Sequence, residues 1–98
     1  MTQITTTDLE KLGRDVACEV AGPAAFEDVA VESGGDFDNR PVYIFSFVID
    51  QDRARDRAGR VRIGLGQKLR DALIELGDEH YPVIRILSRD DWDKRARA

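Results

Sequence analysis

The chain has 98 residues, a length that suits one domain with a modest core. Hydrophobic residues make up 42% and charged residues 35%, and no apolar run approaches the ~20 residues that span a bilayer, so we expect a globular protein without membrane contact. The net charge of −4 disfavours non-specific binding to nucleic acid, because attraction to phosphate grows with positive charge. We therefore expect a single domain over residues 1–98, with frayed ends at 1–4 and 95–98. The lone cysteine, Cys18, fits a reducing, cytoplasmic location.

The first predicted element is a helix that ends before Gly22, since glycine suits the left-handed cap and the proline after it cannot continue a helix. Two starts remain open: Thr7, in a capping box with Glu10, or Thr5. The buried stripe is predicted by apolar residues that recur at helical spacing, namely Leu9, Leu12, Val16, Ala17 and Val20.

Two strands are predicted next. Residues 26–33 include three acidic side chains, which are typical of an edge strand, and residues 41–49 are rich in Val, Ile, Tyr and Phe without a charge. The segment 34–40 between them is rich in Gly, Asp and Asn. Together these features predict an antiparallel hairpin.

The strand at 41–49 is apolar on both faces, which is its most informative property. Successive side chains of a strand point to opposite faces. One face therefore carries Val42, Ile44, Ser46 and Val48, and the other carries Tyr43, Phe45, Phe47 and Ile49. Each face needs a cover.

Residues 51–76 predict one long helix, because apolar residues recur at steps of three and four along them. Each of its three glycines lowers helix stability by about 1 kcal/mol relative to alanine, so a break near Gly59–Gly66, with residues 60–65 extended, is the alternative. Residues 83–87 predict a third strand. Ser88, with Asp91, then caps a short final helix that contains Trp92.

This order predicts an α+β two-layer sandwich, α-β-β-α-β with a short C-terminal helix, in which two helices cover one face of a small three-stranded sheet. The strand order stays open. We expect the aromatic face of the central strand to lack a helix and to contact another subunit or a protein partner. The alternative is that the C-terminal segment with Trp92 folds over it. The predicted interaction residues are Tyr43, Phe45, Phe47 and Ile49.

A second hypothesis rests on arginines that recur along one side of the long helix, namely Arg53, Arg57 and Arg60. Guanidinium groups suit phosphate or carboxylate, although such a stripe is also typical of a solvated helix whose arginines pair with acids. The predicted order over residues 7–87 resembles the type II KH-like and ribosome-binding-factor-like topology, which implies RNA or anion binding. Type II KH domains bind nucleic acid with a Gly-x-x-Gly loop between helices, and this chain has none.

The sequence offers few groups for catalysis. One histidine, His80, and one cysteine supply no zinc ligand set. Asp36, Asp38 and Asn39 offer oxygen ligands but lack the glycine and the glutamate of an EF-hand loop, and adjacent carboxylates such as Asp78 and Glu79 are typical of a solvated surface. We therefore expect no catalytic residue, metal or cofactor. The hypotheses are a non-catalytic interaction or regulatory domain that forms a homo-oligomer or binds a protein, an RNA- or anion-binding domain, and a small enzyme with an unlocated carboxylate site.

Overall fold

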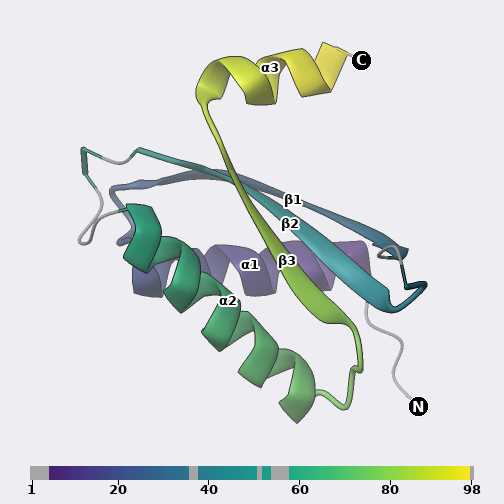
Figure 1. The fold of residues 1–98 in the computed structure, drawn as a ribbon. Coiled ribbons are helices and arrows are strands. Elements are labelled where there is room, and N and C mark those ends of the chain that lie inside the picture. The colour runs from purple at the N-terminus through teal and green to yellow at the C-terminus, as the bar shows by residue number, and fades with distance from the viewer. Residues whose placement is uncertain (1–4, 36–37, 51, 54–57, 98) are drawn as a thin grey trace.

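A computed structural model of the chain describes residues 5–35, 38–50, 52–53 and 58–97. Within these residues, three helices and a three-stranded mixed sheet follow one another in the order α-β-β-α-β-α, which confirms the α+β class (Figure 1). Of the ends expected to fray, residues 1–4 and 98 lie outside the described residues, whereas 95–97 belong to the last turn of α3. The elements are α1 (Thr6–Val20), β1 (Phe26–Gly35), β2 (Pro41–Ile49), α2 (Ala58–Glu75), β3 (Tyr81–Leu87) and α3 (Arg89–Arg97).

The first helix, α1, starts from the Thr5 cap rather than the Thr7 cap. The Asp8 N–H donates to Thr5 Oγ1 at 3.1 Å, and the Thr5 N–H donates to Asp8 Oδ2 at 3.3 Å, which makes a capping box. Beyond its last residue the chain turns at Gly22, whose φ of 100° lies in the left-handed region that glycine adopts without strain. The predicted stripe of α1 faces the core.

The sheet has the order β1-β2-β3, which the sequence had left open. β1 and β2 form the predicted antiparallel hairpin, in which Val31 lies opposite Phe45. β3 runs parallel to β2, with Val42 opposite Tyr81 and Val48 opposite Leu87. Parallel neighbours need a crossover connection, and α2 supplies it.

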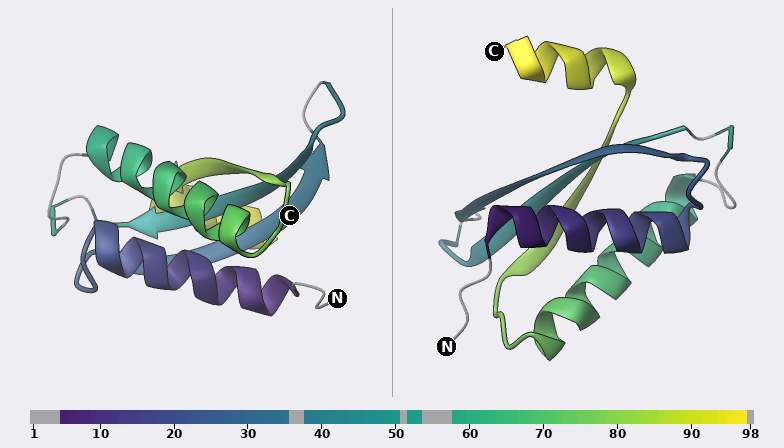
Figure 2. Two further views of the ribbon diagram at one scale, coloured as in Figure 1. Left: turned by 90° about the horizontal axis from the view of Figure 1, so that it is seen from below. Right: turned by 180° about the vertical axis from the view of Figure 1, so that it is seen from behind.

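Both long helices lie on the same face of the sheet, as Figure 2 shows from below, where α1 and α2 stand in front of the strands. The core lies between these helices and the sheet. It contains the core stripe of α1 and the buried leucines of α2, namely Leu65, Leu69 and Leu73. The prediction that the two long helices pack on one face of a small sheet is thus confirmed.

The face that the helices cover is the opposite of the predicted one. Phe45 and Phe47 are fully buried, and Tyr43 and Ile49 are 8% and 7% exposed, all within the core that the helices close. The prediction that these four side chains form an interaction face is therefore wrong. Alternation along a strand separates two faces but does not say which one receives the helices.

The second long helix, α2, begins at Ala58 rather than at residue 51, and Arg53 lies in a turn before it. It continues through Gly64 and Gly66, so the alternative of a break with residues 60–65 extended is wrong. Gly64 allows α1 and α2 to approach closely, because a Cβ at this position would lie 2.9 Å from Val20 Cγ1. At Gly66 a Cβ would lie 3.9 Å from Ile84 Cγ1, an ordinary contact.

We expect opposite outcomes when each of these two glycines becomes alanine. Both changes add about 1 kcal/mol of helix propensity. Gly64→Ala also forces the stiff Val20 side chain to move, and such overpacking costs about 1–3 kcal/mol, so it should lower stability. Gly66→Ala should raise it. Urea denaturation of both variants measures the difference, and equal stabilisation by the two would contradict the close approach of α1 and α2.

Candidate functional site

The candidate site is the sheet face that α1 and α2 leave uncovered, which we call the open face. It is formed by the residues that alternate with the core positions of each strand and are matched by the register: Asp28, Ala30, Glu32, Gly34, Val42, Ile44, Ser46, Val48, Tyr81, Val83, Arg85 and Leu87. Along β2 it carries the apolar side chains of Val42, Ile44 and Val48 and the buried Ser46. The sequence predicted that the two long helices cover this face, whereas they cover the aromatic one.

The open face combines apolar and charged groups. Val42 and Val48 are buried, while Ile44, Val83 and Leu87 are half-buried. Acidic side chains lie on β1 and Arg85 lies on β3, so opposite charges flank the apolar row. Such a surface can contact an apolar partner at its centre and an oppositely charged partner at each side.

The two edges of the sheet, in contrast, are protected against pairing with another strand. On β3, Pro82 has no N–H to donate, and Arg62 Nη2 donates to the Ile84 carbonyl oxygen at 3.3 Å. On β1, the Val29 N–H donates to Asp28 Oδ1 at 2.9 Å. Prolines and charged side chains at an edge strand discourage edge-to-edge association.

The C-terminal helix α3 lies on the same side as the open face, away from α1 and α2 (Figures 1 and 2). Ser88 caps it as predicted, since Ser88 Oγ accepts the Asp91 N–H at 3.1 Å. Arg89 Nη2 lies 3.0 Å from Glu27 Oε1 and ties the start of α3 to β1. Trp92 on α3 is half-buried. The C-terminal segment thus lies on the side of the sheet away from the aromatic residues, so the alternative prediction that it folds over the aromatic face is wrong.

Comparison with protein-family models, curated proteins and solved structures finds no match for this chain. The function is therefore inferred from the residues themselves.

A second group of polar residues lies where β2 and β3 begin, and the end of α2 positions it. Gly77 has a φ of 75°, and the Asp78 N–H donates to the Leu73 carbonyl oxygen at 2.9 Å, which closes the helix in a Schellman-type turn. This turn directs the Asp78 carboxylate toward β2. There Tyr43 Oη donates to Asp78 Oδ2 at 2.7 Å.

His80 completes this group, which we call the Tyr-Asp-His cluster (Tyr43, Asp78 and His80). The His80 backbone N–H donates to Asp78 Oδ1 at 2.8 Å, and its ring Nδ1 lies 2.6 Å from the same oxygen. The imidazole stacks on the Tyr43 ring, with 4.0 Å between centroids and 7° between planes. Sequence reasoning placed His80 in a turn and Asp78 on a solvated surface, whereas the Asp78 side chain is only 10% exposed.

The cluster changes the acidity of two groups. Burial, the hydrogen bond to Asp78 and the negative charge of that carboxylate together raise the pKa of Tyr43 to about 12. Burial alone would raise the pKa of Asp78, but hydrogen bonds from Tyr43 and His80 and the charge interaction with His80 outweigh it and lower this pKa below 3.8. The cluster therefore holds Asp78 ionised and Tyr43 protonated at neutral pH.

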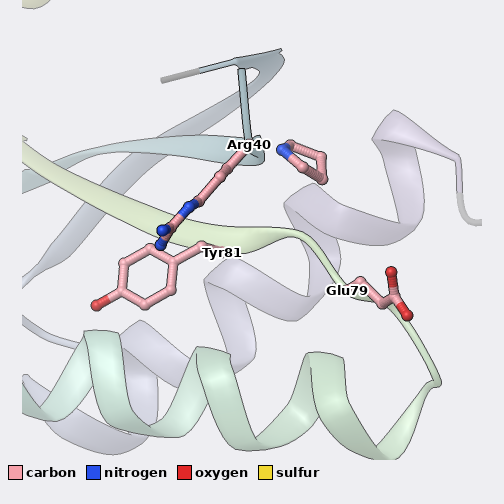
Figure 3. Close-up of a pocket in the computed structure, with 4 residues that line it drawn as sticks. Arg40, Glu79 and Tyr81 are labelled. Atoms are coloured by element: carbon pink, nitrogen blue, oxygen red, sulfur yellow. The ribbon is translucent and has the colours of Figure 1, made fainter. Parts of the chain in front are cut away.

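A cavity of about 410 Å³ lies beside the cluster, lined by Arg40, Pro41, Glu79 and Tyr81 (Figure 3). The Arg40 side chain extends toward the Tyr81 ring, and Glu79 lies at the other end of the group. From α2, Arg70 places its guanidinium carbon 5.6 Å from the centroid of the same ring. His80 is not among the described residues that line the cavity.

The predicted arginine stripe is not assembled as one helical surface. Arg53 lies outside α2 and pairs with Asp50 at 3.5 Å, Arg57 lies outside the described residues, and Arg60 is exposed in the first turn of α2. Within the described residues, His, Cys, Asp and Glu side chains nowhere gather in a group of three that could hold a metal ion. None of the described helices has the length and apolar content that a bilayer span requires.

Proposed function

We propose that this protein is a non-catalytic, cytoplasmic association domain that pairs with a second copy of itself through the open face. The observation that carries the proposal is the one-sided helix layer, because β2 is apolar on both faces and α1 and α2 cover only one. An apolar sheet face without a helix layer is a common site of subunit contact.

The charges of the open face support a second copy as the partner. A two-fold dimer uses the same patch on both subunits, so the patch must complement itself. Asp28 and Glu32 lie on β1 and Arg85 lies on β3, so the patch carries both signs. A partner of one charge sign would match only one side of it.

The protected sheet edges and the position of α3 favour a dimer that forms through the open face over one in which two sheets pair edge to edge. Pro82, the Arg62 hydrogen bond and the Asp28 hydrogen bond occupy or remove edge groups that another strand would need. On the open side, α3 adds Trp92, a residue type enriched at the energetic centres of interfaces.

Sedimentation velocity over a concentration series tests this proposal. We expect the wild type to dimerise, and Val83→Glu to weaken the dimer about tenfold or more, because the change places a carboxylate beside Ile44 among the apolar residues of the contact. Arg85→Glu should weaken it less, since exposed charge pairs contribute about 0–1 kcal/mol.

The matched control is Ile74→Glu. Ile74 is 62% exposed on α2, so this change adds the same charge to the opposite side of the molecule and should leave the dimer intact. A wild type that stays monomeric at high micromolar concentration contradicts the proposal and leaves α3 as the sole cover of the open face. Loss of the dimer only in Ile74→Glu would place the contact on α2.

A further inference from the structure

We propose that the cavity lined by Arg40, Pro41, Glu79 and Tyr81 binds a single nucleotide whose base carries an amino group. Its volume of about 410 Å³ falls within the ~300–1,000 Å³ of small-molecule sites, and suits one nucleotide rather than a duplex. The inference concerns the cavity residues alone and stands whether or not the protein dimerises.

Tyr81 supplies a stacking surface. It begins β3, where its backbone is paired with β2, and its side chain is 55% exposed, so a flat aromatic face is held at the surface by a rigid strand. Aromatic side chains of this kind stack on nucleobases, since every base has a π face.

Two arginines place guanidinium groups at or beside this cavity, although the whole chain carries a net charge of −4. Arg40 lines the cavity, and Arg70 lies over the Tyr81 ring at 5.6 Å. Guanidinium groups bind phosphate through paired N–H donors, and they also strengthen stacking on an aromatic ring. A ligand that joins a planar ring to a phosphate uses both properties at once.

Glu79 restricts the choice of base. It is the acidic residue among the described residues that line the cavity, and an ionised carboxylate only accepts hydrogen bonds. Exocyclic amino groups donate such bonds, and carboxylates pair in this way with the cytosine amino group in nucleic acid recognition. We therefore expect CMP to bind more tightly than UMP, whose base has no amino group.

The walls of the cavity are held in place before any ligand arrives. Pro41 starts β2 and Pro82 follows Tyr81, and the ring of each proline fixes its φ. Behind them, Asp78 accepts hydrogen bonds from Tyr43 and His80 and secures the strand ends on either side of Glu79. Preorganised walls lower the entropic cost of binding. The Tyr-Asp-His cluster thereby acquires a positioning role.

Titration of the ¹⁵N-labelled chain with CMP, UMP and inorganic phosphate tests the site. We expect CMP to shift the amide signals of residues 40, 79 and 81, and to bind more tightly than UMP and at least about tenfold more tightly than phosphate alone. Tyr81→Ala should weaken CMP about tenfold, while Tyr81→Phe should retain binding. Arg14→Gln, on the exposed side of α1, is the matched control for Arg40→Gln and should leave binding unchanged.

A parallel titration with a short single-stranded oligocytidine identifies the source of the nucleotide. Tighter binding of the oligomer at the same amide signals would support the end or loop of a nucleic acid as the source, and preference for CMP would support a free nucleotide. The proposal is overturned if no signal moves at millimolar CMP, if phosphate or UMP binds as tightly as CMP, or if Tyr81→Ala binds CMP like the wild type. Circular dichroism of each variant verifies that it is folded.

Discussion

Phe45→Ala is expected to lower the free energy of unfolding by about 3–5 kcal/mol, the usual cost of removing a buried phenylalanine. The Phe45 side chain is fully buried, with its ring stacked near that of Phe47 at 6.2 Å between centroids. It also lies beneath Gly13 of α1, where an added Cβ would come 3.2 Å from the ring. Because protein atoms surround the Phe45 ring on all sides, its removal leaves a cavity that the neighbouring side chains fill only in part. Guanidinium denaturation of the variant measures the loss.

The control for this prediction is Ile74→Ala, which truncates a side chain that is 62% exposed. Its expected effect is within about 0.5 kcal/mol, the range of ordinary surface substitutions. A small effect of Phe45→Ala on stability, coupled with a change in oligomeric state, would restore the original prediction that the aromatic face meets a partner. A large loss of stability places that face inside the subunit.

Asp78→Asn is expected to destabilise the protein by about 1–3 kcal/mol at pH 7, because it removes the ionised acceptor of hydrogen bonds from Tyr43 and His80. The side chain is 10% exposed, so water replaces these bonds poorly. Tyr43→Phe, which deletes a single donor, should cost less. Thermal unfolding of both variants measures the order of the two effects.

The same cluster predicts how stability depends on pH. The folded pKa of Asp78 lies below its ordinary value of 3.8, so its contribution is complete above that value and is lost as the pH falls through the folded pKa. The folded pKa of Tyr43 is about 12 against an ordinary 10.0, so its contribution is complete below pH 10 and is lost as the pH rises toward 12. Asp78→Asn should abolish the acid-side part, and an unchanged acid transition in that variant would contradict the cluster.

Much of the fold was predictable because local signals agreed with one another. The capped stripe of α1, the uncharged run of β2 and the Ser88 cap of α3 each depend on neighbours along the chain, and the structure contains all three. The start of α2 was misplaced because the apolar spacing continues upstream of Ala58 without a stop signal. Periodicity shows which residues favour a helix, but not where the turn after β2 ends.

The candidate sites were less predictable, because they depend on contacts between distant segments. The parallel pairing of β2 with β3 brings Arg40 and Pro41 beside Glu79 and Tyr81, and no local pattern indicates this pairing. The bond between Tyr43 and Asp78 likewise joins residues 35 positions apart. One local feature of the sequence could have indicated the Tyr-Asp-His cluster. Asp78 directly follows Gly77, which ends α2, and the turn at this glycine holds the Asp78 carboxylate in place.

The most direct test of the central claim is an isotope-filtered NMR experiment on an equal mixture of ¹³C-labelled and unlabelled protein, which detects only contacts between copies. We expect intermolecular contacts from the methyl groups of Ile44, Val83 and Leu87, and none from the rings of Phe45 and Phe47. Contacts from Ile63 and Ile74 of α2 instead, or no contact at any concentration, would contradict association through the open face.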